Sequence, residues 1–281
     1  MQPKFLIIGV QKGGTTSLYQ YLLDHPQVLP AATKEVHFFD LEWHRGLDWY
    51  LNQFPSDAPG DAAIEYPSQY ITGEASPYYV FHPLVPQRAW EFDPSLKIIV
   101  LLRNPVDRAL SHYYHEVRWG FETLEIEAAF DAEADRLAGE LEQFQADPNY
   151  KSYAYQHYSY AARGHYVEQL EAWRSRFGSE QMLVLNSEKF YQSTAESLQR
   201  VIDFLELQPY DFYGFNDQFE KYNAGDYCLP DQSFQQSLQG RFHETNQQLR
   251  DYLQREFPRD WQAEFADRCD WLGERSTPAI A

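Results

Sequence analysis

The chain has 281 residues, of which 43% are hydrophobic and 17% aromatic, enough apolar material for a large core. Its 23 basic and 42 acidic residues give a formal net charge of −19, which opposes binding to nucleic acid and to anionic membranes. Two cysteines, Cys228 and Cys269, form neither a metal-binding spacing nor a disulfide framework. Any anion site must therefore be a local concentration of Lys, Arg and backbone N–H groups.

The N-terminus runs directly into an apolar segment without a signal-peptide pattern. No apolar run approaches the roughly 20 residues that a membrane-spanning helix needs. We therefore expect a cytoplasmic protein with no membrane span.

The first element has the pattern of a strand, a glycine turn and a helix. The apolar run Phe5–Ile8 predicts a buried strand, and the segment after Ser17 predicts a helix that stops near Pro26. Gly13 and Gly14 stand in the turn between them. Unpaired N–H groups and the positive end of the helix dipole make such a turn an anion site.

This turn does not match the P-loop pattern Gly-x-x-x-x-Gly-Lys-Ser/Thr. Lys12 precedes the glycine pair instead of following it, and no Gly-Lys is followed by a hydroxyl residue to hold magnesium. Taken alone, the glycines also fit a tight strand-to-helix connection.

Further along the chain, strands alternate with helices. Strands are predicted at 70–74, 97–102 and 182–185, and helices at 47–54, 83–91, from 105 onward, and at 161–177, 195–205 and 234–257. The acidic segment 122–147 predicts a solvated amphipathic helix or helix pair, and 55–61 and 209–227 are irregular. The alternation predicts one α/β domain over 1–281, with a central parallel sheet flanked by helices.

A second anion site is predicted where the strand 97–102 ends. Arg103 follows this strand, and Ser111 lies eight residues further on, about two turns into the next helix. In isolation, Arg103 could be a structural ion pair and Ser111 an ordinary helix residue. Ligands of such sheets bind beyond the carboxyl ends of the strands, so Lys12 and Arg103 should share one cleft.

The order of these segments resembles that of sulfotransferases that use 3′-phosphoadenosine 5′-phosphosulfate (PAPS), especially the heparan-sulfate-type N- and 3-O-sulfotransferases and their bacterial relatives. The segments that carry the resemblance are LIIGVQKGGTTSLYQYLLDHP, KEVHFFD, HRGLDWYLNQFP, TGEASPYY, KIIVLLRNPVDRALSHYYHE, RGHYVEQLEAWRSRF and EQMLVLNSEKF. The resemblance implies one α/β domain with a P-loop-like nucleotide cleft.

The resemblance also implies roles for residues that match the family's motifs. Lys12 would contact the oxygen between phosphate and sulfate, and Arg103 and Ser111 would bind the 3′-phosphate. The 5′-phosphosulfate would be cradled by Gly13, Gly14, Thr15, Thr16 and Ser17. Released product would be 3′-phosphoadenosine 5′-phosphate (PAP).

On the acceptor side, Glu35 matches the family's general base and His115 matches a histidine near the transferring group in the N-sulfotransferase branch. Lys221 and Asn223 fall where the family has a lid over the nucleotide. His37 and His112 could line the acceptor pocket or be core histidines. In-line sulfuryl transfer needs no metal, and no His/Cys/Asp cluster has metal-site spacing.

Two departures from the family bear on the acceptor. Glycosaminoglycan members usually have Glu-Lys before the Ser-Pro step, where this chain has Glu74-Ala75. The family's lysine-rich lid is bridged by two cysteines, whereas only Cys228 lies near this one. Together with the net charge of −19, these departures favour a neutral or cationic acceptor over a polyanionic one, with a hydroxyl or alternatively an amine as the group sulfated.

Two other functions are compatible with parts of the pattern. A P-loop-type kinase or NTPase would also use a glycine turn, although the Gly-Lys-Ser/Thr sequence is missing. A catalytically silent nucleotide-binding module would keep the fold but would not transfer a sulfuryl group.

Overall fold

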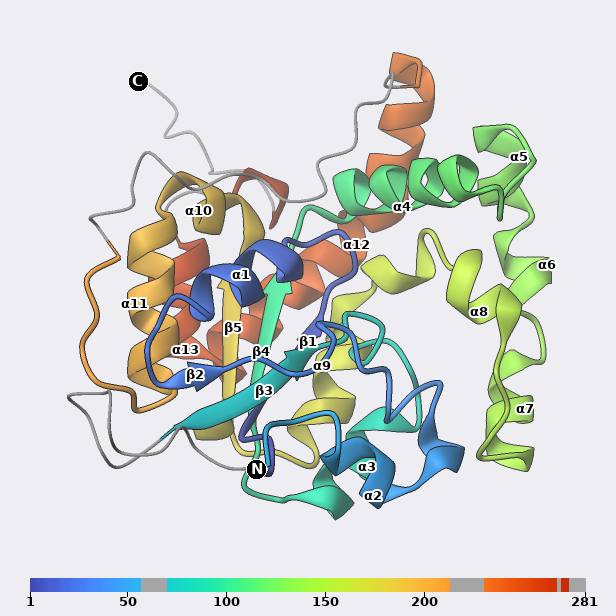
Figure 1. Cartoon of the computed structure of the whole chain (residues 1–281). Helices are drawn as coiled ribbons and strands as arrows, with labels where there is room; N and C mark the ends of the chain where they lie inside the picture. The colour runs from blue at the N-terminus through green and yellow to red at the C-terminus, as the bar shows by residue number, and fades with distance from the viewer. Residues whose placement is uncertain (57–69, 213–229, 267–268, 273–281) are drawn as a thin grey trace, which may run out of the picture.

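The computed structural model describes residues 1–56, 70–212, 230–266 and 269–272. Within them the centre of the molecule is a five-stranded sheet in the order β2-β3-β1-β4-β5 (Figure 1). All four neighbouring pairs are parallel. The strands are β1 (Phe5–Gly9), β2 (Val28–Leu29), β3 (Ile71–Ala75), β4 (Lys97–Leu102) and β5 (Met182–Asn186).

Helices connect the strands and cover the sheet. The α-helices are α1 (Thr15–Leu22), α2 (Leu47–Leu51), α3 (Val85–Phe92), α4 (Pro105–Trp119), α5 (Ile126–Asp131), α6 (Glu133–Leu137), α7 (Glu140–Ala146), α8 (Tyr153–His157), α9 (Tyr166–Arg174), α10 (Ser187–Gln192), α11 (Thr194–Phe204), α12 (Gln232–Glu256) and α13 (Pro258–Asp260). Short 3-10 turns lie at Trp43–Arg45, Ala162–Gly164, Ser179–Gln181 and Asp270–Leu272, and a π-helical turn at Trp261–Phe265. None of the described helices is both long and apolar enough to cross a bilayer.

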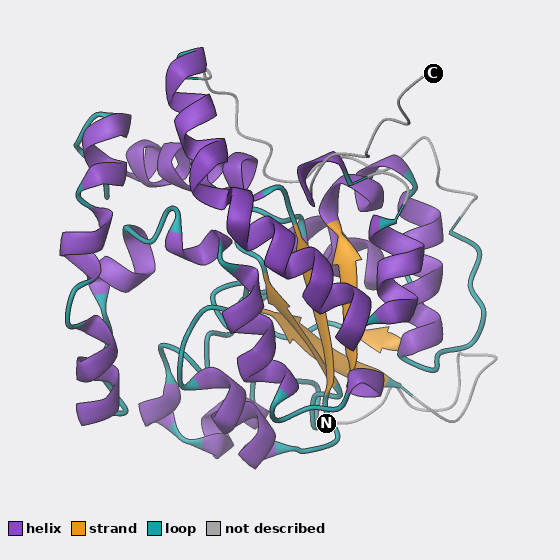
Figure 2. Cartoon of the chain, turned by 180° about the vertical axis from the view of Figure 1, so that it is seen from behind, coloured by secondary structure: helices purple, strands orange, loops and turns teal. Residues whose placement is uncertain are grey.

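Successive residues of each strand point to opposite faces of the sheet, and both faces are buried. On one face, Phe5 and Ile7 of β1 join a core with α1, α10 and α11. On the other, Leu6 and Ile8 join a core with α3, α9 and α12. Figure 1 shows α1 and α11 on the near side, and Figure 2 shows the opposite face covered by helices. Continuous apolar strands therefore form here because neither face meets water.

A smaller group of helices extends beyond the edge of the sheet. The long helix α4 packs its apolar side on α5 and on the start of α12, through residues such as Leu110, Phe130 and Phe242. Helices α5 to α8 follow α4 in Figure 1, away from β5. This arrangement places the ends of α4 and α8 next to the carboxyl ends of the strands.

The predicted fold class is confirmed: the described residues build an α/β domain with a parallel sheet flanked by helices. The predicted extent, 1–281, stays a prediction. Strand β2 was not predicted, since two residues are too few to show a pattern. The predicted helix 161–177 is shorter, because a 3-10 turn occupies Ala162–Gly164.

The acidic segment 122–147 differs from the prediction of one helix or a pair. It forms three short helices, α5, α6 and α7, separated at Ala132 and at Gly139, whose φ of 82° is left-handed. It is also not wholly solvated. Glu133 is buried, and its carboxylate accepts the backbone N–H groups of Ala161 and Ala162 at 2.8 Å each.

Candidate active site

A cavity of about 960 Å³ opens where the strands end. Residues that follow four different strands contribute to its wall: Lys12 after β1, Tyr78 after β3, Arg103 after β4 and Ser187 after β5. The full lining is Gln11, Lys12, Gly14, Thr15, Thr16, Glu35, His37, Pro77, Tyr78, Arg103, Asp107, Ser111, His115, Glu116, Arg118, Trp119, Phe121, Gln156, His157, Arg163, Ser187, Glu188, Tyr191 and Gln192. The carboxyl edge of a parallel sheet is where such folds bind ligands.

The glycine turn has the geometry of an anion site. Helix α1 begins at Thr15, with no side-chain cap and no acidic residue in its first turn. The positive end of its dipole therefore faces the cavity. Gly14 has a left-handed φ of 99°, and a Cβ there would lie 2.8 Å from the Tyr191 hydroxyl oxygen. Only glycine fits this position without strain.

Gly13 and Ser17 contribute to the packing of this region and not to the cavity wall. Gly13 does not line the cavity, and a Cβ on it would lie 2.9 Å from the carbonyl oxygens of Val10 and Leu101. Gly13 thus lets the turn pack closely on β4. Ser17 is buried, with its hydroxyl 3.2 Å from that of Tyr191, so it braces α1 against α10 instead of lining the cavity.

Four cationic side chains line the cavity: Lys12, Arg103, Arg118 and Arg163. An Arg103 N–H donates to the carbonyl oxygen of Lys12 at 2.8 Å, which joins the turn after β1 to the end of β4. Burial lowers the pKa of Lys12, and the positive charges of Arg118 and Arg103 lower it further. No carboxylate of the described residues forms an ion pair with any of these four. Ser111, from α4, lines the same cavity.

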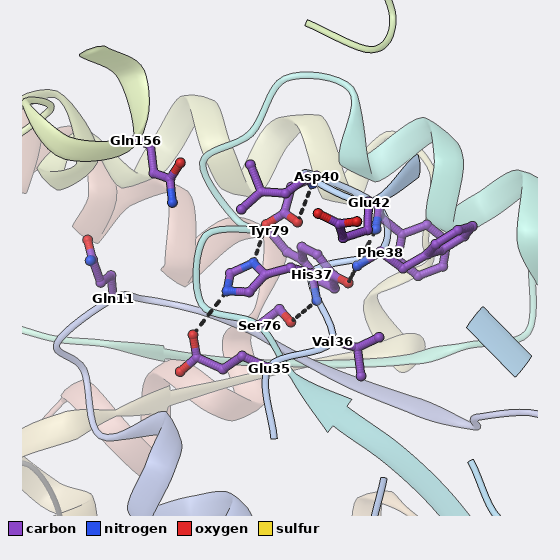
Figure 3. Close-up of polar contacts among 12 residues, drawn as sticks. Gln11, Glu35, Val36, His37, Phe38, Asp40, Glu42, Ser76, Tyr79 and Gln156 are labelled. Atoms are coloured by element: carbon purple, nitrogen blue, oxygen red, sulfur yellow. Dashed lines mark hydrogen bonds and ion pairs between the residues drawn. The ribbon is translucent and has the colours of Figure 1, made fainter. Parts of the chain in front are cut away.

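On the opposite side lies a chain of charged groups, shown in Figure 3. The Glu35 carboxylate is 3.1 Å from His37 Nε2, and His37 Nδ1 is 2.8 Å from the Asp40 carboxylate. Glu35 also contacts the ammonium group of Lys34. Glu35 and His37 both line the cavity, whereas Asp40 is buried behind them.

The pKa values in this chain are strongly shifted. Burial lowers the pKa of His37, but the Asp40 and Glu35 carboxylates outweigh it and raise that pKa to about 10. Burial raises the pKa of Glu35, but the hydrogen bond from His37 and the charge of Lys34 outweigh it and lower that pKa to about 2. At neutral pH Glu35 is therefore a carboxylate and His37 an imidazolium.

A buried carboxylate positions this segment. Glu74, at the end of β3, accepts hydrogen bonds from the hydroxyls of Tyr50 and Tyr79 at 2.9 Å each, and from the backbone N–H of Val36 at 3.1 Å. Ser76 donates to Glu74 at 2.6 Å and accepts the His37 N–H at 3.1 Å. This network holds the backbone of His37 in a left-handed conformation, φ 54°.

Sequence reasoning did not find the roles of Asp40, Ser76 and Tyr79. The segment TGEASPYY was recognised as a motif, yet nothing in its spacing shows that Glu74 reaches Val36. A buried Glu followed by two tyrosines is the signal that could have indicated such a network.

The histidines of α4 divide into two environments. His115 lines the cavity, and burial together with the charge of Lys12 lowers its pKa. His112 is fully buried and does not line the cavity, so its placement favours the core alternative over an acceptor contact. Its ring lies 5.1 Å from that of Tyr160.

Arg163 was also missed as a site residue. It is buried, with its guanidinium 4.6 Å from the Tyr78 ring, and it donates to Gln11 at 2.5 Å and to the Gln156 carbonyl at 2.7 Å. Figure 3 places Gln11 and Gln156 on the side of His37 away from Asp40. Arg163 thus connects the turn after β1 to α8.

Lys221 and Asn223 lie outside the described residues, so their predicted contact with a nucleotide stays a prediction. Within the described ranges, no group of three or more His, Cys, Asp or Glu side chains is arranged to hold a metal ion.

The fold and the cavity define an α/β protein with an anion-binding cleft at the carboxyl edge of its sheet. The family model described as "Sulfotransferase domain" matches residues 2–268, so this chain belongs to the sulfotransferase family. The predicted resemblance is thereby confirmed.

Individual relatives agree with this assignment. Human heparan sulfate glucosamine 3-O-sulfotransferase 5 is 32% identical over 235 residues, which are 81% of this chain and 59% of that protein. Mouse bifunctional heparan sulfate N-deacetylase/N-sulfotransferase 2 is 29% identical over 238 residues, 80% of this chain and 24% of that protein. A crystal structure of a sulfotransferase from Alicyclobacillus acidocaldarius is 26% identical, with a TM-score of 0.59, covering 96% of this chain and 99% of that one. The chain thus spans little more than half of the first relative's length.

Proposed function

We propose that this protein transfers a sulfuryl group from PAPS to a hydroxyl, or alternatively an amine, of an acceptor that is not a polyanion. The observation that carries the proposal is the convergence of Lys12, Arg103 and Arg118 in one cavity without carboxylate partners among the described residues. In a chain of net charge −19, such repelling cations are stabilised when an anion binds between them.

The residues present fit a nucleotide with phosphate at both ends. Gly14, Thr15 and Thr16 at the start of α1 suit the 5′-phosphosulfate, since N–H groups and hydroxyls converge there. Arg103 and Ser111 suit the 3′-phosphate, because a guanidinium fork and a hydroxyl match phosphate oxygens. Lys221 and Asn223 remain proposed contacts of the lid.

Bound in this cleft, PAPS would supply the sulfuryl group, which passes to the acceptor oxygen while its bond to the phosphate oxygen breaks. Lys12 would stabilise the negative charge that develops on the leaving oxygen, an effect worth roughly 3–4 kcal/mol for a well-placed donor. No metal ion is part of the proposed reaction.

Glu35 would accept the proton that the acceptor hydroxyl loses. Its low pKa keeps it ionised at neutral pH, and the His37 imidazolium, held by Asp40, fixes its orientation. A carboxylate of pKa about 2 is a weak base. This suits a loose transition state, in which the proton leaves late. His115 also lines the cavity, where the charge of Lys12 lowers its pKa, and it would contact the group being transferred.

The proposed acceptor is neutral or cationic. The cavity lining has four carboxylates against four Lys and Arg side chains and the His37 imidazolium, so its excess of positive charge is small for a polysaccharide of many sulfates. The cytoplasm is the proposed location, since PAPS is made there.

Calorimetry with PAP tests the donor site directly. Wild-type protein is expected to bind PAP, and Arg103→Ala should weaken that binding at least about tenfold, the loss of a charge-assisted hydrogen bond. Labelled PAPS offered with a hydroxyl and amine library then tests transfer. Absence of PAP binding would overturn the proposal, and PAP binding without label in any acceptor would favour a silent nucleotide-binding module.

A further inference from the structure

One wall of the cavity, which we call the α4–α8 wall, consists of Trp119, Phe121, Tyr153 and His157. Trp119, Phe121 and His157 line the cavity, and Tyr153 packs beside them. Three of these side chains are unusually exposed for large aromatics: Trp119 at 63%, Tyr153 at 51% and Phe121 at 38%. Aromatic rings exposed together beside a cavity indicate a binding surface.

His157 is held firmly in this wall. Its Nδ1 is 2.7 Å from the Glu116 carboxylate, and its ring lies 4.3 Å from that of Phe121 and 4.4 Å from that of Tyr153, between centroids. With Nδ1 engaged, Nε2 is the nitrogen left for a ligand; it has no hydrogen-bond partner among the described residues. His157 is therefore oriented as a hydrogen-bonding group with one fixed ring position.

The Glu116 side chain is itself held in place by burial and by a second histidine. Its side chain is only 3% exposed, and its second oxygen lies 3.2 Å from Nε2 of the fully buried His112. A buried carboxylate between two imidazoles orients both of them. His112 is thus a core residue that contacts Glu116 from the side away from the cavity.

The turn after α4 fixes Phe121. Gly120 ends α4 with a left-handed φ of 77°, and the Phe121 N–H donates a hydrogen bond to the Glu116 carbonyl oxygen at 2.9 Å. The Tyr158 hydroxyl donates to the Phe121 carbonyl at 3.0 Å. The guanidinium of Arg136 lies 4.0 Å from the Tyr158 ring centroid. The aromatic wall is thus preorganised and not a loose surface.

We propose that the α4–α8 wall is the acceptor subsite, and that it binds an uncharged acceptor whose hydroxyl lies on or beside a ring with an apolar face. This inference rests on the proposed function. Phe121 and Trp119 would contact the ring face, and His157 would form a hydrogen bond to a polar group on the acceptor. Glu116 is a positioning residue, and its negative charge opposes an anionic acceptor at this place.

Two ring chemistries fit this description, an aryl ring and the apolar face of a sugar. We use 2-naphthol as the aryl probe, cellobiose as the uncharged sugar probe and heparan sulfate as the anionic probe. Each is offered with labelled PAPS, and its binding to PAP-loaded protein is measured by saturation-transfer NMR. At least one uncharged ring probe is expected to bind and to accept label, in preference to heparan sulfate.

The residues are tested with the probe that binds best. His157→Ala and Phe121→Ala should each raise the acceptor KM about tenfold, the scale of one hydrogen bond or ring contact, with kcat changed less than about threefold. Glu116→Gln should raise KM similarly, and Tyr153→Ala serves as a second variant because this side chain is 51% exposed. His243→Ala, an exposed histidine of α12, is the matched control and should leave KM unchanged.

PAP affinity separates the two proposals. If wild-type protein does not bind PAP, the proposed function fails. If PAP binds normally in every variant but heparan sulfate is the preferred probe, or neither ring probe binds, or the acceptor KM does not respond to His157→Ala and Phe121→Ala, the acceptor subsite is wrong while the donor site stands.

Discussion

At the scale of single residues, Glu35 and Lys12 have opposite charges and opposite environments. The surroundings of Glu35 stabilise its negative charge, whereas those of Lys12 destabilise its positive charge. The ion pair with Lys34 and the hydrogen bond from His37 keep Glu35 ionised. Burial and two arginines make the Lys12 ammonium less stable than in water. Both residues are therefore poised to interact with charge that the reactants bring.

Replacing Glu35, the proposed base, should lower the turnover rate without changing nucleotide binding. Glu35→Gln is expected to lower kcat at least about a hundredfold, within the range of general-base catalysis, with little effect on PAP affinity. Steady-state kinetics and calorimetry measure the two effects. Glu42→Gln, a carboxylate of the same segment that pairs with Lys151, is the matched control and should keep its turnover. Near-normal turnover of Glu35→Gln would remove Glu35 from the role of base.

The two cations should differ in kinetic effect. Lys12→Ala is expected to lower kcat by about 10²–10³, because the leaving oxygen loses its charged donor. Arg103→Ala should act mainly on nucleotide affinity, since its proposed contact is the 3′-phosphate. Equal losses of kcat and of PAP affinity in both variants would contradict this division of roles.

His37 makes stability depend on pH in a defined direction. Its folded pKa of about 10 lies above the ordinary value of 6.5, so its charge stabilises the fold fully below pH 6.5. That contribution is lost as pH rises from 6.5 through 10. Asp40→Asn removes the main partner and should lower the His37 pKa, which NMR titration of the imidazole protons measures.

The same substitution gives a second readout. The difference in unfolding free energy between wild type and Asp40→Asn should shrink between pH 7 and pH 10, measured by urea denaturation. A difference that stays constant over this interval would show that His37 is not charged in the folded protein.

At the scale of elements, the segment 34–40 takes its shape from the end of β3. Glu74 gathers four hydrogen bonds in a fully buried position, and burial raises its pKa. Glu74→Ala should lower the unfolding free energy by about 3 kcal/mol or more, since it leaves buried donors without a partner.

Glu74→Gln keeps the volume and part of the acceptor capacity, so it should cost less. Chemical denaturation of the two variants tests this order. If Glu74→Ala unfolded no more easily than Glu74→Gln, the four hydrogen bonds would not be what holds the segment.

Four of the five strands, and the shared cavity of Lys12 and Arg103, could be predicted from the sequence because their signals are local. Apolar runs of four to six residues next to Lys12 and Arg103 show both the strand and the group at its end. The contacts of Glu74 with Val36 and of Glu116 with His157 could not be predicted. They join residues 38 and 41 positions apart, and only the folded backbone brings them together.

Helix boundaries show the same limit. The predicted helix 234–257 agrees closely with α12, since its periodic apolar positions extend over many turns. The acidic segment was misjudged because short helices such as α6 are fixed by tertiary contacts of Glu133 and not by their own pattern.

At the scale of the whole molecule, the chain carries a net charge of −19 although its proposed ligand is an anion. Long-range repulsion should slow the approach of PAP at low salt. Its association rate constant is therefore expected to rise as salt increases from about 10 mM to 150 mM, where the screening length falls from roughly 30 Å to 8 Å. Stopped-flow measurements test this. A rate that falls with salt would show that the local field of Lys12, Arg103 and Arg118 dominates at long distance.

The sheet order also has a consequence for diversification. β1 lies between β3 and β4, so one neighbour of the central strand leads to Arg103 and the other to the segment that Glu74 shapes. The proposed 3′-phosphate contact Arg103 and the proposed base Glu35 therefore stand on opposite sides of the strand that leads to Lys12. Exchange of the segment after α4, which carries Phe121 and His157, between homologues should change the acceptor while PAP affinity stays the same.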